Sequence, residues 1–463
     1  MTTATPDAIT FLAPTGMLGT GFPEASLEAG LERRPAFLGV DSGSTDQGPQ
    51  ALGTGEPLLS REAVRRDLAL LLPAALRHGI PLLVGSAGTS GSDDSLDWLW
   101  DVLREVAREQ DLHPRVALIR AEQQAEHLAA ELRAGRIHPL GAAPALEEAT
   151  LRRARRIVAM MGPEPFQAAL DRGADVVLAG RSTDAAIFAA PLLRAGAAPG
   201  PAWHAGKILE CGAAASTART APDGMLGLVD GAGFSVEPLD PEMRCSPLSV
   251  AAHALYETPD PTRLVEPPGT LVTSDCRYEQ AEDGRSVRVT GSAFEPAERY
   301  TVKLEGAELA GYQTIIPAAV RDPLLLRQLD AWTTTLLQKI RERAQSILGG
   351  ALEPGAWSVG VRVYGRDGAL GALEPERRLE GHEAMLLFEF TAPEQRQATA
   401  IAKSAGLLAM HHPIAGWEGF VNAVAFPYAP YEIERGAVWR FSLNHVWELA
   451  DPLAPFPIAV REL

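Results

Sequence analysis

Three short apolar runs in the first half of the chain each end in a loop of glycine, serine, threonine and aspartate. The runs cover residues 36–40, 80–84 and 174–178. Helically spaced apolar residues follow the first two loops over 61–78 and 93–110, and another helical pattern follows the third. The pattern predicts three strand–loop–helix units. Because open parallel α/β sheets bind ligands beyond the carboxyl ends of their strands, we expect the three loops to converge on one crevice.

The alternation of strand-like and helix-like patterns continues to about residue 220. Residues 1–35 carry turn signals and are expected to form an ordered loop with one short helix over 24–33. The other expected elements are strands over 116–119 and 157–161 and helices over 122–133, 146–155 and 165–172. This alternation is typical of α/β domains, so we predict an α/β fold with a doubly wound, mostly parallel sheet.

Beyond about residue 222 the pattern changes. Short β-like runs separated by Gly, Pro and Asp predict a β-rich insertion, which a long helical pattern over 323–348 follows. The last part is expected to form strands over 357–363, 384–390 and 438–443 and a helix over 393–411. We therefore expect three segments: an α/β core over 1–220, a β-rich insertion with a long helix over 221–349, and a small α+β domain over 350–463.

Charge and composition exclude some classes of partner. The 463 residues carry a formal net charge of −17, so nucleic acid and anionic membranes are not expected to attract the chain. Three cysteines at irregular spacing fit neither a disulfide framework nor a zinc motif. The N-terminus lacks the pattern of a signal peptide, and no apolar run approaches the roughly 20 residues of a membrane span. We expect a cytoplasmic homo-oligomer that acts on a small molecule.

The three loops carry the first group of candidate residues. These are Asp41, Ser42, Ser44, Thr45 and Asp46 in the first loop, Ser86, Thr89 and Ser90 in the second, and Arg181, Ser182, Thr183 and Asp184 in the third. A guanidinium beside hydroxyls and helix N-terminal amides suits a carboxylate or phosphate group of a ligand. In the structural alternative, the hydroxyls serve turns, Thr183 or Asp184 caps the next helix, and Arg181 pairs with Asp41 or Asp46.

Asp41, Asp46 and Asp184 could also hold Mg²⁺ if their loops converge, because Mg²⁺ prefers carboxylate oxygens. No nucleotide-binding glycine motif with the expected context occurs at the three loops, so no other cofactor is evident. A Mg²⁺ site at these three aspartates is therefore one hypothesis that the sequence allows.

His204, Glu210 and Cys211 form the second group. Together they offer a base, an acid and a soft nucleophile for proton transfer next to a carbonyl. Alternatively, Cys211 has only the structural role of a small buried apolar residue, which is the commonest state of a lone cysteine. Lys303, two residues before Glu305 on an expected strand, faces the same side as that glutamate. The two residues are expected to form either a surface ion pair or a pair that faces the substrate.

Several longer motifs resemble one family. They are FLGVDSGSTD at 37–46, GRSTDAAIF at 180–188, GKILECG at 206–212, YTVKLEG at 300–306, FPYAP at 426–430 and LNH at 443–445. The chain resembles the acyclic terpene utilisation (AtuA) family over most of its length. That family is named for a bacterial gene cluster that degrades citronellol- and geraniol-type acids as coenzyme A thioesters. The resemblance implies bacterial catabolism of a carboxylic acid or its acyl-CoA thioester, without a settled reaction.

The preferred hypothesis is a lyase that hydrates or dehydrates such a compound. Arg181 and the loop hydroxyls would hold its anionic end, while Glu210 or Asp46 moves a proton α to the carbonyl. A second hypothesis is an actin-like ATPase or kinase, since Asp41-Ser-Gly-Ser-Thr45 resembles the first phosphate-binding turn of that fold. A helical pattern follows this loop, however, where the actin-like fold has a hairpin. A third hypothesis is a non-catalytic subunit that binds substrate or scaffolds a partner enzyme.

Overall fold

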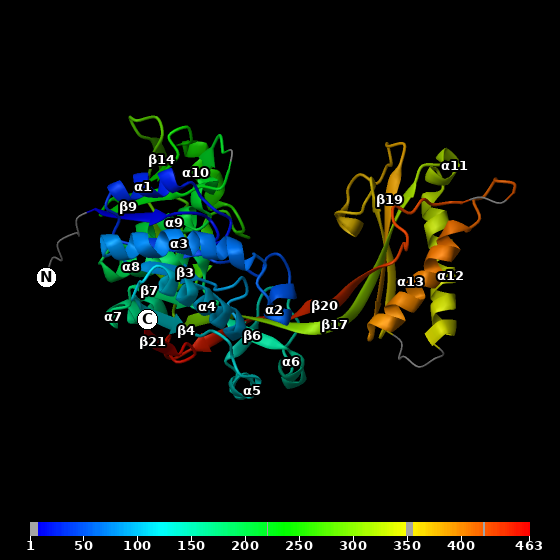
Figure 1. Ribbon diagram of the computed structural model, residues 1–463, viewed down its shortest axis with the longest axis horizontal. Helices are drawn as coiled ribbons and strands as arrows, with labels where there is room; N and C mark the ends of the chain where they lie inside the picture. Colours follow the sequence, from blue (N-terminus) through cyan, green and yellow to red (C-terminus); the bar gives the residue numbers. More distant parts are fainter. Residues whose placement is uncertain (1–7, 220, 349–354, 420–421) are drawn as a thin grey trace. The chain divides into compact units, whose positions relative to one another are not determined.

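The computed structural model describes residues 8–219, 221–348, 355–419 and 422–463. The chain divides into two compact units, Met1–Glu308 with Phe441–Leu463, and Leu309–Arg440. It passes from one unit to the other within two long strands, β17 (Tyr300–Val320) and β20 (Ile433–Leu449) (Figure 1). This division differs from the three expected segments because the last residues return to the first unit. Such a return leaves no trace in the local sequence pattern.

The first unit is built on a ten-stranded mixed sheet. Five neighbouring strands run parallel, in the order β1 (Ile9–Ala13), β2 (Leu38–Asp41), β3 (Leu82–Gly85), β7 (Val176–Ala179) and β4 (Arg115–Ile119). The antiparallel strands are β9 (Met225–Asp230), β10 (Gly233–Pro238), β15 (Val287–Thr290) and β14 (Arg277–Gln280) beside β1, and β21 (Ile458–Glu462) beside β4.

The α/β class is therefore confirmed. The doubly wound, mostly parallel sheet is not confirmed, because antiparallel strands flank the five parallel ones in a mixed sheet. Four strands of the β-rich segment, β9, β10, β14 and β15, and the C-terminal strand β21 join the same sheet as the parallel strands. The expected loop at the N-terminus also contains β1, which pairs with β2 in the centre of the sheet. Strands from distant parts of the sequence join one sheet through backbone hydrogen bonds. A local apolar pattern can predict a strand, but it does not show which other strand will pair with it.

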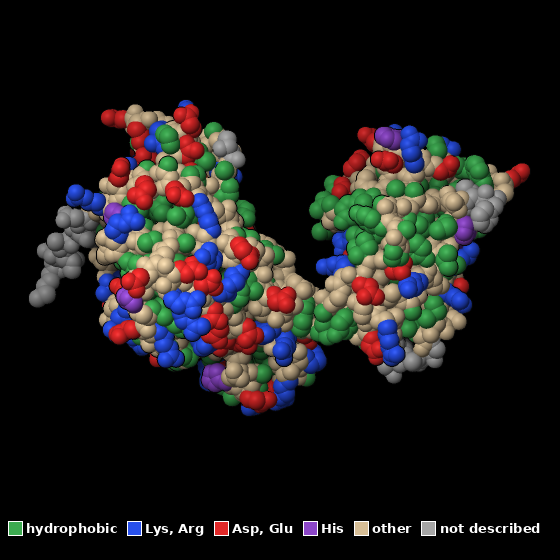
Figure 2. Space-filling view, in the orientation of Figure 1, with side chains coloured by type: hydrophobic (Ala, Val, Ile, Leu, Met, Phe, Trp, Pro, Cys, Tyr) green, Lys and Arg blue, Asp and Glu red, His purple; other side chains and the backbone are tan. Residues whose placement is uncertain are grey.

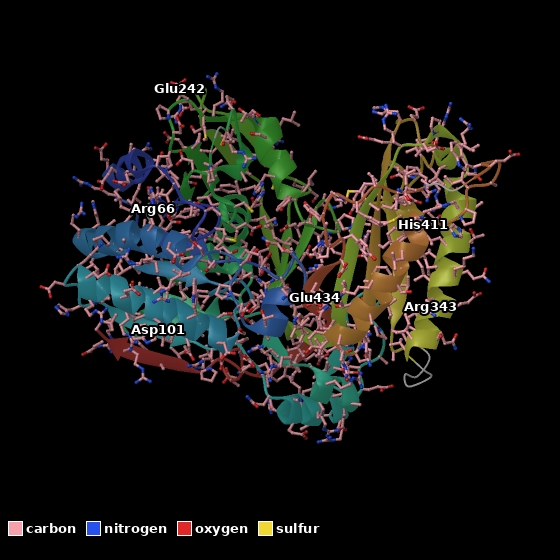
Figure 3. All side chains as sticks on the ribbon, turned by 45° about the vertical axis from the view of Figure 1, so that its right-hand side comes forward. Arg66, Asp101, Glu242, Arg343, His411 and Glu434 are labelled. Carbon is pink, nitrogen blue, oxygen red and sulfur yellow. The ribbon has the colours of Figure 1, made fainter. Side chains whose placement is uncertain are left out.

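Alternation along the strands places apolar side chains on both faces of this sheet. Phe11 and Phe37 belong to the hydrophobic cluster on one face, whereas Leu12 and Leu38 belong to the cluster on the other. Helices α7 (Glu164–Asp171), α8 (Asp184–Arg194) and α9 (Pro199–Leu209) contribute to the first cluster. Helices α1 (Glu24–Glu32), α3 (Arg61–His78) and α4 (Asp93–Glu109) contribute to the second. Arg66 of α3 and Asp101 of α4 carry partly exposed charges on these helices (Figure 3).

Smaller elements complete the first unit. They are α2 (Gln50–Thr54), α5 (Ala125–Arg133), β5 (Ile137–Pro139), α6 (Glu148–Arg153), β6 (Arg156–Ala159), β8 (Ser216–Thr217), β11 (Arg244–Cys245), α10 (Pro247–Ala254), β12 (Arg263–Glu266), β13 (Gly269–Val272) and β16 (Ala293–Pro296). Strand β6 pairs with β17, with Val158 opposite Glu305. This pairing brings β17 to the edge of the α/β core.

The second unit has its own antiparallel sheet and core. Strands β18 (Ser358–Tyr364), β19 (Ala384–Ala392) and the second half of β17 pair side by side. Helices α12 (Leu329–Leu348) and α13 (Gln395–Met410) pack their apolar residues into the same cluster as this sheet. The long helix expected over 323–348 is divided into α11 (Pro323–Leu326) and α12.

Acidic and basic side chains are interspersed over the face of the molecule in Figure 2. Among the described residues, no helix is long and apolar enough to cross a bilayer.

One glycine tests how closely the second and third loops approach. A Cβ atom at Gly91, whose φ is +64°, would lie 2.1 Å from Arg181 N, whereas one at Gly79, with φ +63°, would have nothing within 4 Å. Gly79→Ala is expected to cost about 1 kcal/mol for its left-handed backbone. Gly91→Ala is expected to cost about 1–3 kcal/mol more, because the loops must separate. Urea denaturation of both variants measures the difference, and equal costs would contradict the close approach.

Candidate functional site

The three loops that follow β2, β3 and β7 meet at one edge of the sheet. Ser42 N donates a hydrogen bond to Gly85 O at 2.9 Å, and Ser86 N donates one to Gly180 O at 3.1 Å. The expected convergence is therefore confirmed. It follows from the strand order, because β3 lies between β2 and β7 and all three run parallel.

The second loop has a strained backbone. Ser86 and Thr89 adopt φ values of +46° and +80°, which are uncommon for residues other than glycine. Such conformations persist where surrounding contacts hold them, and they are frequent near functional sites.

Arg181 is buried at the centre of the meeting loops. Its Nε donates to Glu305 Oε2 at 3.1 Å, its Nη1 donates to Ser86 Oγ at 3.1 Å, and Nη1 lies 3.6 Å from Asp184 Oδ1. The structural alternative named Asp41 or Asp46 as the partner, but the main partner is Glu305 from β17. The guanidinium thus ties the loops to β17. Its expected role in holding a ligand anion stays a prediction.

Glu305 is the common acceptor for three side chains. Its Oε2 accepts hydrogen bonds from Arg181 Nε and from Thr45 Oγ1 at 2.9 Å, and its Oε1 lies 2.7 Å from Lys303 Nζ. Burial by itself would raise the pKa of Glu305, but the charges of Arg181 and Lys303 bring it down to about 2. Glu305 is therefore ionised at neutral pH. Lys303 and Glu305 do face the same side, as expected, although the glutamate is buried.

Most of the loop hydroxyls bind other parts of the loops. Ser42 Oγ accepts from Gly88 N, Thr89 Oγ1 accepts from Leu58 N, Ser90 Oγ contacts the hydroxyls of Ser92 and Ser95, and Ser44 Oγ donates to Asp46 Oδ2. These contacts agree with the turn and cap roles of the structural alternative. A role in ligand binding stays a prediction for each of these hydroxyls.

Helix α9 ends in a buried, hydrogen-bonded pair of ionisable side chains. Lys207 Nζ donates to Glu210 Oε1 at 2.5 Å, and both side chains are about 95% buried. Burial is the main cause that raises the pKa of Glu210 to about 8, and the Asp184 and Glu266 carboxylates add to it, while Lys207 lowers it. Burial lowers the pKa of Lys207, but Glu210 and the other acidic groups around it, such as Asp184, together raise that pKa, so Lys207 stays charged.

Three more carboxyl groups with raised pKa values lie within electrostatic range. Burial raises the pKa of Glu266 to about 8 and that of Asp184 to about 6. Burial and the Asp184 carboxylate raise the pKa of Asp41 well above its usual value. The site thus holds five carboxyl groups and three cations, namely Asp41, Asp184, Glu210, Glu266 and Glu305 with Arg181, Lys207 and Lys303. Full ionisation would leave two uncompensated negative charges, so the site retains protons near neutral pH.

Several oxygens in this site have no hydrogen-bond partner within the part of the chain that the structure describes. They are Asp41 Oδ1, Ser182 Oγ and Asp184 Oδ1. Thr183 stands at the N-cap position of α8, but its side chain makes no cap hydrogen bond. Buried polar atoms normally have partners, so this group of oxygens indicates a place for water or a polar ligand.

His204 was expected to lie beside Glu210 and Cys211, but the structure places it elsewhere. Its Nδ1 lies 2.8 Å from Ser292 Oγ and its Nε2 lies 3.3 Å from Tyr278 OH. Burial lowers the pKa of His204 to about 3, so the ring is neutral. Residues six apart on a helix point roughly 120° away from each other, which explains why His204 and Glu210 face different neighbours.

Cys211 is half-buried at the wall of a cavity of about 670 Å³ that Arg219 and Asp223 also line. Burial and the charge of Glu210 raise the pKa of this thiol, which disfavours the thiolate at neutral pH. Its role as a nucleophile stays a prediction.

No group of three or more His, Cys, Asp or Glu side chains in the described ranges is arranged to hold a metal ion. A site for Mg²⁺ at Asp41, Asp46 and Asp184 therefore stays a prediction. The loop after Asp41 continues into α2 and not into a hairpin, so its path adds no support to the actin-like alternative.

The sequence pattern predicted no role for Glu266, and it predicted no role in proton transfer for Lys207 or Glu305. Lys207 lies in the GKILECG motif and Glu305 in the YTVKLEG motif. These two motifs were the sequence features that could have pointed to both residues. Glu266 ends β12 and reaches the site only through the folding of the β-rich segment.

The fold and site define a mixed α/β protein with a buried acid–base cluster. The chain belongs to the acyclic terpene utilisation family, because the model of "Acyclic terpene utilisation family protein AtuA" matches residues 61–435. The matched part includes Arg181, Glu210 and Glu305. No curated protein and no solved structure matches the chain significantly.

The Arg181–Glu305 pair yields a stability prediction. Arg181→Met is expected to lower the free energy of unfolding by about 3 kcal/mol, because the buried Glu305 carboxylate loses its buried cation and keeps only the partly exposed Lys303. Arg181→Met combined with Glu305→Gln should recover part of that loss. The matched control is Arg194→Met, which removes an exposed ion pair with Asp171 and should cost no more than about 1 kcal/mol. Similar losses for Arg181→Met and Arg194→Met in urea denaturation would contradict the central role of Arg181.

Glu266 yields a prediction about pH. Its pKa rises from an ordinary 4.5 to about 8 on folding, so the folded protein keeps a proton that the unfolded chain releases. The contribution of this group to stability is therefore best below pH 4.5 and falls as pH rises to about 8. Glu266→Gln should gain stability relative to the unsubstituted protein between pH 5 and pH 8. Urea denaturation at both pH values measures this gain.

The control is Glu295→Gln, since Glu295 is exposed and Arg263 lowers its pKa. This control should leave the difference between pH 5 and pH 8 unchanged. A Glu266→Gln variant with the pH dependence of the unsubstituted protein would show that Glu266 is ionised in the fold.

Proposed function

We propose that the chain is a lyase of the hydratase or dehydratase type that acts on a small carboxylic acid or its acyl-CoA thioester. The observation that supports it most is the buried Lys207–Glu210 pair beside further carboxyl groups that hold protons. Groups of this kind suit general acid–base catalysis, because they can give and take protons near neutral pH. Membership of the acyclic terpene utilisation family supports the substrate class.

Dehydration needs two proton transfers. A base removes the proton α to the carbonyl, and an acid protonates the hydroxyl group on the β carbon, which leaves as water while the double bond forms. Asp184, with a pKa of about 6, is the better base at neutral pH, and Glu210, with a pKa of about 8, is the better acid. Hydration of the double bond is the reverse of this sequence.

The environment of Lys207 fits the same chemistry. Its ammonium group is held by Glu210 and lies 5.7 Å from the centre of the Tyr256 ring. A fixed positive charge in a buried site stabilises negative charge that develops on a carbonyl oxygen during proton removal. Lys207 would therefore be the electrostatic partner of the enolate-like transition state.

The experiment is a turnover screen with purified protein. Saturated, α,β-unsaturated and β-hydroxy forms of short linear and branched acids, free and as coenzyme A thioesters, are incubated in deuterated water. Mass spectrometry then detects gain or loss of water and deuterium at the α carbon. For the best substrate, Glu210→Gln should lower kcat by about 10²–10⁴-fold, because the variant cannot transfer a proton. The dependence of kcat/KM on pH should be bell-shaped, with limbs near pH 6 and pH 8.

Glu295→Gln serves as the control and should keep full activity, since its side chain is exposed and lies on β16. Circular dichroism would establish that Glu210→Gln is folded. Turnover unchanged in folded Glu210→Gln would contradict the assignment of this residue. Binding of several acids or thioesters without any chemical change would contradict a lyase and would favour a substrate-binding subunit.

A further inference from the structure

A second cavity of the first unit adjoins the buried cluster. Its volume is about 390 Å³, and the loop after β2, the first half of β17 and the last half of β20 supply its walls. Residues 441–444 lie about 400 residues after the Asp41 loop, so no local sequence pattern predicted that they would share a site with it. A cavity of this size is in the range of small-molecule sites, near its lower end.

One end of the cavity carries charged groups, namely the ammonium group of Lys303 and the carboxylates of Glu305 and Asp46. Lys303 retains 36% exposure of its side chain, and its ammonium group has three donors, one of which points to Glu305 Oε1 at 2.7 Å. Arg181 and Thr45 already satisfy the other oxygen of Glu305. One ionised carboxylate thus faces two cations, and Lys303 is the one that the cavity exposes. Asp46, whose carboxylate accepts from Ser44, also lines the wall.

The other end is apolar. Phe441 and Leu443 stand two positions apart on β20, so they lie on the same face of that strand. The Phe441 side chain is 44% exposed, which is high for a large aromatic residue, while Leu443 is buried. A cation opposite an aromatic and an aliphatic side chain fits an amphipathic ligand, with one oxygen-bearing end and one hydrocarbon chain.

We propose that this cavity binds the acyl group of the substrate, with a carboxylate or carbonyl oxygen at Lys303 and the hydrocarbon chain against Phe441 and Leu443. The proposal rests on the proposed function for the identity of the ligand as an acyl compound. In this proposal Lys303, and not Arg181, binds the carboxylate or carbonyl oxygen of the ligand. Arg181 already donates hydrogen bonds to Glu305 and Ser86. A chain of contacts leads from Lys303 through Glu305 and Arg181 to Asp184, and so connects the bound end with the cluster.

Binding of free acids tests the proposal without any need for turnover. Isothermal titration with butanoate, hexanoate and octanoate should give affinities that rise with chain length, because a longer chain covers more of the exposed Phe441 ring. Lys303→Met should weaken the binding of all three acids by about tenfold to 100-fold, since a charge-assisted hydrogen bond is lost. Lys303→Arg should restore most of the affinity. Phe441→Ala should weaken octanoate more than butanoate.

Two variants of the second unit serve as controls. Lys403→Met removes an exposed lysine and Tyr428→Ala an exposed aromatic ring, and both should bind the acids as the unsubstituted protein does. Inorganic phosphate is the probe for a plain anion site. Phosphate that competes as well as octanoate, together with no effect of Phe441→Ala, would overturn the proposal.

The absence of binding by the unsubstituted protein would also overturn it, as would equal affinities in Lys303→Met and Lys403→Met. Failure of the proposed function would look different. Acids would then bind with the expected dependence on Lys303 and Phe441, but no acid or thioester would be hydrated or dehydrated.

Discussion

The site depends on one buried ion pair, between Arg181 and Glu305. Three loops that end parallel strands supply a cation and hydroxyl groups, and β17 supplies the carboxylate that holds them. A buried charge is costly unless it is paired and hydrogen-bonded, so the loss of either residue would be costly for the other. Lys303 and Thr45 complete the coordination of Glu305. The pair therefore fixes the loops on β17 and sets the distance between the two sides of the site.

The excess of carboxyl groups around this pair gives the site its chemical character. Five carboxyl groups share three cations, and burial makes each uncompensated negative charge expensive. Protons are retained on Glu210 and Glu266, whose pKa values rise to about 8, whereas Glu305 stays ionised with a pKa of about 2. Carboxyl groups in one site therefore differ in protonation because their neighbours differ. Such a difference is what a pair of acid and base catalysts needs.

The region that matches the family model contains most of the buried cluster but only part of the cavity wall. Residues 61–435 include the second and third loops, the Lys207–Glu210 pair and Glu305, but not the Asp41 loop or Phe441 and Leu443. These outer segments form walls of the 390 Å³ cavity. The ionisable groups of the buried cluster other than Asp41 thus lie within the family match, while part of the cavity wall lies outside it. In our proposals, the inner part carries the proton chemistry and the cavity selects the acyl chain.

The sequence by itself determined the strand–loop–helix units, the α/β class, most element positions and the family. These features depend on local periodicity, short loops and motifs, which neighbouring residues specify. Only the tertiary structure decided that β1 and β21 join the central sheet, that Glu305 and not Asp41 or Asp46 is the main partner of Arg181, and that His204 faces Ser292 and Tyr278. It also brought Glu266 and Phe441 to the site. Contacts of this kind join residues far apart in sequence, and packing and charge pairing in the complete fold select them, so no local pattern could reveal them.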